Sequence, residues 1–164
     1  MKLFLVRHGI ALDGLNAEVR SDAQRPLTLE GRDETEQVAK GLKKSGVKID
    51  HLVSSPLVRA RQTAEIFHEV FKLEKEIEIC HALAPGGHHT DLYKVLKASK
   101  QESIALFGHE PDMGELAQTL LCADFAIPFK KAGVCRIDVF EMPPSSPGIL
   151  KWFMPPKISK MLGK

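Results

Sequence analysis

Residues 4–9 read "FLVRHG", which places an arginine, a histidine and a glycine directly after a run of apolar side chains. Phe4, Leu5 and Val6 are continuously apolar, which is typical of a strand buried on both faces of a sheet. The polar residues that follow stand at the carboxyl end of this strand. Because ligands of open α/β sheets bind beyond the carboxyl ends of the strands, this position is a candidate for a functional site.

The rest of the chain alternates between strand-like and helix-like patterns. Apolar runs of the strand type occur at 2–7, 49–54, 77–80, 103–107, 134–140 and 149–153. Apolar residues at near-helical spacing occur at 28–45, 56–71, 91–99 and 112–121. The alternation predicts an α/β fold with three layers, α/β/α, around a mainly parallel central sheet. The 164 residues fit a single domain, and residues 155–164 are expected to form a surface tail.

The composition is that of a globular protein, with 43% hydrophobic residues, 27% charged residues and a formal net charge of +2. The basic residues are scattered, so no nucleic-acid partner is expected. Three cysteines without paired spacing fit neither a disulfide framework nor a zinc site. The first apolar run ends after four residues, too short for a signal peptide or a membrane span, and the predicted location is therefore cytoplasmic.

Polar groups follow the carboxyl ends of three predicted strands. Arg7 and His8 follow the first, Arg59 lies on the helix after the second, and His109 follows the fourth. If these strands are parallel neighbours, their ends meet at one edge of the sheet. The sequence then predicts a pocket that contains two histidines and two arginines.

These residue types suit the transfer of a phosphoryl group. Arg7 and Arg59 offer planar, permanently charged forks that match phosphate oxygens, and the neutral imidazole of His8 is a competent nucleophile toward phosphorus. His109, kept protonated by a bound phosphate, can donate to the oxygens that carry charge in the transition state. Gly9 is expected to let the backbone turn sharply after the nucleophile.

Three motifs in this order resemble the signature of the histidine phosphatase superfamily, which has the phosphoglycerate mutase-like fold. They are "RHG" at 7–9, "SSPLVRARQTAE" at 54–65 and "GHEP" at 108–111. The short chain and the segment "RPLTLEGRDET" at 25–35 are similar to the SixA-type phosphohistidine phosphatases within that superfamily. The resemblance implies a phosphatase that uses neither a metal nor another cofactor.

The resemblance also implies roles for individual residues. His8 would be the nucleophile that is transiently phosphorylated, and Arg7, Arg59 and His109 would hold the phosphoryl group, with Gly9 beside them. Asp22 and Arg25 fall where SixA-type proteins have an Asp and an Arg near the mouth of the pocket.

One departure from the superfamily bears on the substrate. Mutases and many phosphomonoesterases of the superfamily carry a Glu after the third strand that protonates the leaving oxygen, whereas residues 79–93 here read "ICHALAPGGHHTDLY" and contain no Glu. A phosphohistidine can leave as neutral imidazole once its own ring is protonated, so it tolerates this absence best. His88, with a place in the phosphate site, and His89 or Asp91 remain alternative proton donors.

The histidines at 81, 88 and 89 raise the question of a metal site. Only Cys80 and Asp91 lie near them in sequence as further ligands, and transition-metal sites need three or four convergent ligands, so no metal site is predicted. His51 is expected at the surface.

The sequence therefore predicts a metal-independent phosphatase that removes phosphate from a phosphorylated histidine through a covalent intermediate on His8. The expected partner is a phosphohistidine-containing protein, for example a histidine-containing phosphotransfer domain, and nothing requires more than a monomer. Two alternatives stay open: a small-molecule phosphomonoesterase of the same superfamily, and a non-catalytic module that binds phosphoproteins.

Overall fold

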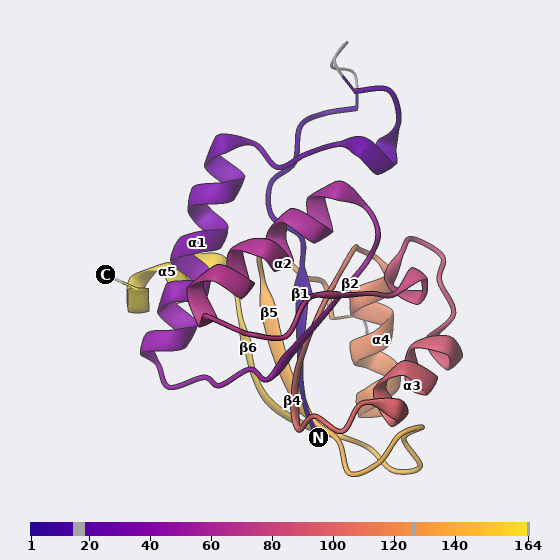
Figure 1. Ribbon diagram of the computed structural model, residues 1–164. Helices are drawn as coiled ribbons and strands as arrows, with labels where there is room; N and C mark the ends of the chain where they lie inside the picture. The colour runs from indigo at the N-terminus through magenta and orange to yellow at the C-terminus, as the bar shows by residue number, and fades with distance from the viewer. Residues whose placement is uncertain (15–18, 126, 164) are drawn as a thin grey trace.

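The computed structural model describes residues 1–14, 19–125 and 127–163. It contains a single twisted sheet with helices on both faces (Figure 1). The strands are β1 (Lys2–Arg7), β2 (His51–Ser54), β3 (Glu78–Ile79), β4 (Ser103–Gly108), β5 (Val134–Asp138) and β6 (Ile149–Met154). The helices are α1 (Leu29–Lys44), α2 (Val58–Phe71), α3 (His89–Ala98), α4 (Asp112–Leu121) and α5 (Pro156–Gly163), with short 3-10 turns η1 (Asp22–Gln24) and η2 (His81–Leu83).

The strand order is β3-β2-β4-β1-β5-β6. β3, β2, β4 and β1 run parallel to one another, whereas β5 runs antiparallel to β1 and β6 runs antiparallel to β5. The prediction of a mainly parallel α/β sheet is therefore confirmed. β4 lies between β1 and β2, so the three strands whose ends carry the candidate residues are neighbours.

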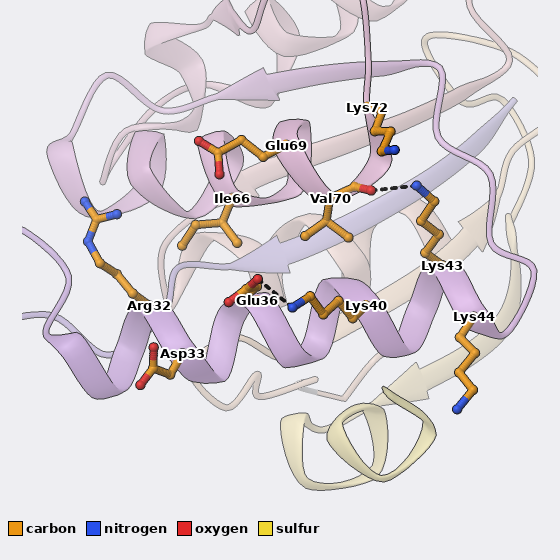
Figure 2. Close-up of a pocket in the computed structure, with 10 residues that line it drawn as sticks. All are labelled: Arg32, Asp33, Glu36, Lys40, Lys43, Lys44, Ile66, Glu69, Val70 and Lys72. Carbon is orange, nitrogen blue, oxygen red and sulfur yellow. Dashed lines mark hydrogen bonds and ion pairs between the residues drawn. The ribbon is translucent and has the colours of Figure 1, made fainter. Parts of the chain in front are cut away.

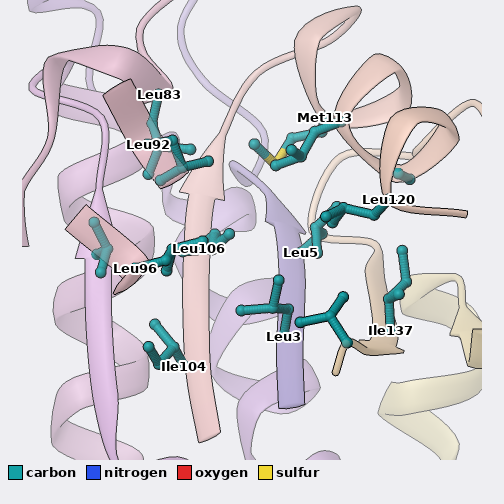
Figure 3. Close-up of a cluster of buried hydrophobic side chains, with 14 of the residues drawn as sticks. Leu3, Leu5, Leu83, Leu92, Leu96, Ile104, Leu106, Met113, Leu120 and Ile137 are labelled. Atoms are coloured by element: carbon teal, nitrogen blue, oxygen red, sulfur yellow. The ribbon is translucent and has the colours of Figure 1, made fainter. Parts of the chain in front are cut away.

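Successive side chains of β1 enter two separate hydrophobic cores. Leu3 and Leu5 pack with α3 and α4 on one face of the sheet, as Figure 3 shows for part of this cluster. Phe4 and Val6 pack with α1 and α2 on the other face. Because side chains of a strand point alternately to opposite faces, a continuous apolar run is what a strand covered on both sides requires. β1 is thus fixed at the centre of the molecule, and its carboxyl end has little freedom.

The C-terminal residues do not form the surface tail that the sequence predicts. Residues 156–163 form α5, which packs against α1. Gly41 makes this approach possible, because a Cβ at that position would collide with the carbonyl oxygen of Ser159. Lys160 adds an ion pair with Glu34, at 2.7 Å. The helix exists because α1 offers it a small-residue surface, a contact between segments more than a hundred residues apart in the sequence.

His51 is also placed differently from the prediction. It starts β2, is 1% exposed, and its Nε2 lies 2.8 Å from Oε2 of Glu78 on the edge strand β3. A polar ring can be buried here because the neighbouring strand supplies a carboxylate partner.

Candidate active site

Two histidines leave the sheet side by side. Arg7, the last residue of β1, is the register partner of Gly108, the last residue of β4. The next residues, His8 and His109, therefore stand at the same edge, and their ring centroids are 5.1 Å apart. Ser55, the residue after β2, leaves the sheet at this edge as well. The structure thus brings together residues from three strand ends, as the sequence pattern indicated.

The imidazole of His8 is held in one orientation with its Nε2 lone pair exposed to the site. The side chain is 7% exposed, and Nδ1 lies 2.7 Å from the carbonyl oxygen of Gly9. Because a carbonyl oxygen can only accept, Nδ1 carries the hydrogen and donates it. The lone pair of the neutral ring is then on Nε2, and Nε of Arg59 donates to it over 3.2 Å.

Burial keeps both histidines neutral near pH 7. It lowers the pKa of His8 from 6.5 to about 4, and the charges of Arg59 and Arg7 act in the same direction. Burial, with further contributions that include His8 and Arg59, lowers the pKa of His109 to about 3. A neutral His8 keeps a nucleophilic lone pair on Nε2, which accepts from Arg59 in this structure. A phosphate dianion bound between the rings would favour the protonated form of His109, since an opposite charge raises the pKa of a histidine.

Ser55 orients the ring of His109. The ring is 2% exposed, and its Nε2 lies 2.8 Å from Oγ of Ser55. That oxygen also accepts the backbone N–H of Leu57 over 3.3 Å, and its hydroxyl can either donate to Nε2 of His109 or accept from it. In the tautomer in which Ser55 donates, the ring hydrogen of neutral His109 is on Nδ1, a buried atom that has no partner among the described residues. An N–H in this situation can donate to an oxygen of a bound phosphate.

Asp22 and Arg25 extend the site on the side of Arg59. NH1 of Arg59 donates to the carbonyl oxygen of Asp22 over 2.8 Å, and NH2 donates to its carboxylate over 3.0 Å. The second carboxylate oxygen accepts from NH1 of Arg25 over 2.9 Å. Hydrogen bonds from Arg25 and Arg59 hold the pKa of Asp22 below its usual range, so this group is a carboxylate. Of the two residues expected near the pocket mouth, Asp22 therefore lies against the buried Arg59, and Arg25 is joined to it through Asp22.

Arg7 is held by the backbone on the opposite side. Its NH1 donates to the carbonyl oxygen of Phe129 over 2.6 Å, while its buried Nε has no partner among the described residues. Burial lowers the pKa of Arg7, and the nearby charge of Glu110 opposes that shift. Part of this guanidinium is thus free to bind an anion.

Gly9 is required by close packing. A Cβ at this position would lie 2.5 Å from Oγ1 of Thr35 and 3.1 Å from the carbonyl oxygen of Gly31, both on α1. Its N–H donates to Oγ1 of Thr63 over 3.0 Å. The sequence predicted a sharp turn as the reason for this glycine, whereas the structure gives the close approach of α1 to the end of β1.

The three alternative proton donors lie at the start of α3. Asp91 is exposed and pairs with Lys94 at 2.7 Å, and the ring of His89 lies 6.4 Å from that of Tyr93. His88 is exposed at the residue before the helix. In the part of the chain that the structure describes, no hydrogen bond, ion pair or ring contact joins these residues to the two histidines and two arginines.

Sequence reasoning gave no role to three residues that support the site. Ser55 orients His109, and Glu110 contacts the loop that holds Arg7. Thr63 accepts from the backbone N–H of Gly9 and donates to the carbonyl oxygen of Arg59. All three lie within the motifs at 54–65 and 108–111, and Thr63 follows Arg59 by about one helical turn, which was the available signal.

A cavity of about 680 Å³ lies elsewhere, between α1 and α2 (Figure 2). Its lining is mostly charged, and several of these groups already have partners: Lys40 pairs with Glu36 at 2.6 Å, and Lys43 donates to the carbonyl oxygen of Val70 over 2.7 Å. None of the residues around His8 contributes to its wall.

Outside residues 15–18, 126 and 164, no three histidine, cysteine or acidic side chains converge in a way that could bind a metal ion. Over the same residues, none of the helices has the length and apolar content needed to cross a bilayer.

The sequence model of the histidine phosphatase superfamily (branch 1) matches residues 3–85. The chain belongs to this superfamily. The match begins in β1, includes α2 and its Arg59, and ends just after η2. It therefore covers the carboxyl ends of β1 and β2, two of the three strand ends that build the site.

Relatives within the histidine phosphatase superfamily extend the similarity over the whole chain. The phosphohistidine phosphatase SixA of Escherichia coli (strain K12) is 30% identical over 98% of this chain and 98% of its own. An uncharacterized protein of Picosynechococcus sp. is 36% identical over 82% of each chain. The structure of the protein histidine phosphatase SixA complexed with tungstate superposes with a TM-score of 0.84, at 29% identity over 96% of this chain and 98% of that one.

Proposed function

We propose that this protein is a phosphohistidine phosphatase that works through a covalent phosphate on Nε2 of His8. The observation that carries the proposal is the fixed tautomer of His8, which donates from Nδ1 to Gly9 and offers its lone pair at Nε2 beside Arg59. A nucleophile of this kind, between two arginines and a second histidine, suits attack on phosphorus. The similarity to SixA, in sequence and in structure, supports the same conclusion.

In the first step, Arg7, Arg59 and Nδ1 of His109 bind the oxygens of the phosphoryl group. Nε2 of His8 forms a bond to phosphorus as the phosphorus–nitrogen bond of the substrate breaks. The substrate ring, protonated on its other nitrogen, leaves as neutral imidazole. In the second step, water attacks phosphorus, the bond to His8 breaks, and inorganic phosphate is released with the proton of the water transferred to solvent or phosphate.

The choice of a phosphorus–nitrogen bond is supported by the state of two carboxyl groups, those of Asp22 and Asp91. Asp22 contacts Arg59, and its lowered pKa keeps it ionised, so it has no proton to give. Asp91 pairs with Lys94 on α3. A leaving alkoxide needs a proton donor, whereas a ring-protonated phosphohistidine does not. The substrate that this site favours is thus a phosphorylated histidine.

The partner we propose is a protein that carries this phosphohistidine, because SixA, which is 30% identical over 98% of this chain, is named a phosphohistidine phosphatase, and a SixA structure is described as that of a protein histidine phosphatase. The monomeric state, the cytoplasmic location and the lack of a nucleic-acid partner remain predictions from the sequence.

The test uses a peptide that contains phosphohistidine, with the release of inorganic phosphate as the readout. We expect turnover by the unmodified protein and at least a hundredfold loss for His8→Ala, since the covalent route needs that nitrogen. Acid quenching of the unmodified protein should trap little phosphate, whereas alkaline quenching should retain it on His8. Full turnover by His8→Ala would contradict the mechanism.

The same assay separates the alternatives. A small-molecule phosphomonoesterase would hydrolyse alkyl phosphates as fast as aryl phosphates, and that result would show that a proton donor acts on the leaving oxygen. Tight binding of the phosphopeptide without phosphate release over hours would instead identify a binding module.

A further inference from the structure

The guanidinium of Arg7 depends on a segment far from it in the sequence. Its NH1 donates to the carbonyl oxygen of Phe129 over 2.6 Å. No carboxylate bonds Arg7 directly among the described residues, in contrast to Arg59, which is bonded to Asp22. The position of the Phe129 peptide therefore decides where this guanidinium points.

Phe129 is itself fixed by two contacts. Its ring is 2% exposed and packs edge-on against the ring of Phe153 on β6, with centroids 5.0 Å apart. Its backbone N–H donates to Oε1 of Glu110 over 3.2 Å. The same carboxylate also accepts the backbone N–H of Gly114 in the first turn of α4. Glu110 thus joins the start of α4 to the loop that holds Arg7.

The charge of Glu110 reaches Arg7 as well. The electrostatic interaction between the two opposes the lowering of the pKa of Arg7 and the raising, by burial, of the pKa of Glu110. The carboxylate of Glu110 bonds the N–H of Phe129, and Arg7 bonds the carbonyl oxygen of the same residue. Arg7 thus has a counter-charge nearby that does not occupy its guanidinium. The buried Nε, which has no partner among the described residues, stays available for an anion.

We propose that Glu110 is a positioning residue for Arg7, which it aims at the phosphate by fixing the Phe129 peptide. The proposal rests on the phosphatase function proposed above, because it assigns to Arg7 the binding of phosphoryl oxygens. Glu110 follows His109 directly. The turn after β4 would therefore supply both a histidine that binds the phosphate, His109, and the residue that positions Arg7.

Two other roles fit Glu110 less well. As a proton donor to the leaving group it would need a free oxygen facing the site, yet its carboxylate accepts from Phe129 and Gly114. As a simple cap of α4 it would need no contact with Phe129 at all. The bond to Phe129 is the one that connects Glu110 with the chemistry.

The test is a double-mutant cycle that uses Glu110→Ala, Arg7→Ala and the double variant of the full chain. Two quantities are measured: kcat/KM on the phosphohistidine peptide, and the Kd of orthovanadate by calorimetry. In the otherwise unmodified protein, Glu110→Ala should reduce kcat/KM and vanadate affinity about tenfold, because small displacements of a phosphate ligand are costly. In the Arg7→Ala background the same change should have no further effect on either quantity, since residues that act through one another are not additive.

Asp112→Ala is the matched control. This carboxylate lies in the first turn of α4 and accepts the backbone N–H of Gly86 over 3.0 Å, so its loss perturbs the same helix end without touching Phe129. We expect it to change both quantities less than about twofold. Glu110→Gln keeps an oxygen for the N–H of Phe129 and should recover most of the loss.

The proposal would be overturned if Glu110→Ala reduced kcat/KM and vanadate affinity by the same factor with and without Arg7. It would also be overturned if Glu110→Gln lost as much of both quantities as Glu110→Ala. Urea unfolding of each variant identifies a general loss of fold, which would appear in both backgrounds. Failure of the proposed phosphatase function would be seen as absent turnover by the unmodified protein. The vanadate titration would still measure the coupling between Glu110 and Arg7, because vanadate binding needs no turnover.

Discussion

The two arginines of the site are held by very different parts of the molecule. Arg7 ends the central strand β1 and bonds to the carbonyl oxygen of Phe129, a residue 2% exposed. Arg59 is equally part of a rigid element, α2, but its partner Asp22 has a side chain that is 61% exposed, in the short turn η1. One arginine is therefore positioned by the core, and the other is bonded to a surface segment.

Because of this difference, we expect the sheet edge and the segment around Asp22 to contribute unequally to activity. The sheet edge, with Arg7, His8, Ser55 and His109, is anchored to the ends of β1, β2 and β4. The segment around Asp22 offers a carboxylate to Arg59 in the absence of an anion, and a phosphate must share that guanidinium or displace the carboxylate. We expect substitutions at the sheet edge to affect catalysis much more than substitutions at the exposed segment.

The largest effect is expected from the arginines themselves. Arg7→Ala and Arg59→Ala should each lower kcat/KM on the phosphohistidine peptide by about 10² to 10³, the usual cost of removing one donor to a charged transition state. Arg59→Ala should be the worse of the two because it also removes the donor that positions Nε2 of His8. Arg61→Ala, which removes a 50% exposed side chain two residues further along α2, is the control and should be nearly silent. Comparable activity of Arg7→Ala and the unmodified protein would remove Arg7 from the site.

Acid should destabilise the buried side of the site. Because burial lowers the folded-state pKa of His8 from 6.5 to about 4, the unfolded chain takes up the proton first as the pH falls. The contribution of neutral His8 to the free energy of unfolding is complete above pH 6.5 and is lost as the pH falls toward about 4. Its size is on the order of 3 kcal/mol. Urea unfolding at several pH values measures the free energy of unfolding. We expect this free energy to fall less steeply with decreasing pH in His8→Asn than in the unmodified protein. Parallel curves for the two proteins would contradict the buried, neutral ring.

Ser55→Ala should have an intermediate effect. Without the hydroxyl, Nε2 of His109 loses its partner at 2.8 Å and the ring is no longer held with Nδ1–H toward the phosphate. We expect kcat/KM to fall about tenfold, the free-energy equivalent of one hydrogen bond in a buried site. The affinity for orthovanadate should fall in parallel. A variant with lower thermal stability but unchanged kcat/KM would mean that Ser55 supports the fold alone.

The smallest effect is expected at the exposed segment. Asp22→Ala should change kcat/KM no more than about fivefold, because exposed ion pairs are worth about 0 to 1 kcal/mol. Asp91→Ala, which removes an exposed carboxylate that pairs with Lys94, is the matched control. A loss as large as that of Arg59→Ala would show that the segment around Asp22 is as important as the sheet edge, and the unequal contributions expected above would be wrong.

Much of the site could be predicted because its residues are tied to regular patterns. The run "FLV" identifies a strand covered on both faces, and Arg7 and His8 follow its end by sequence adjacency alone. Arg59 and His109 follow two further strands in the same way, so parallel pairing was enough to place them together. Ser55 and Glu110 were visible in the motifs but carried no signal of their own, because their partners are a histidine 54 residues away and a loop peptide 19 residues away.

The C-terminal helix and the burial of His51 are two features of the fold that could not be predicted from the sequence. Residues 156–163 become α5 through contact with Gly41 on α1, and His51 is buried because β3 brings Glu78 beside it. Neither contact leaves a periodic trace in the sequence of the segment itself.

The sequence by itself determined the α/β alternation, the positions at the strand ends and hence the chemistry of two histidines and two arginines. These follow from local patterns of apolar and polar residues. Only the tertiary structure decided which nitrogen of His8 holds the lone pair, which groups hold Arg7 and Arg59, and why Gly9 must be a glycine. Those properties depend on distances between atoms of remote segments, and such distances are set when the chain packs.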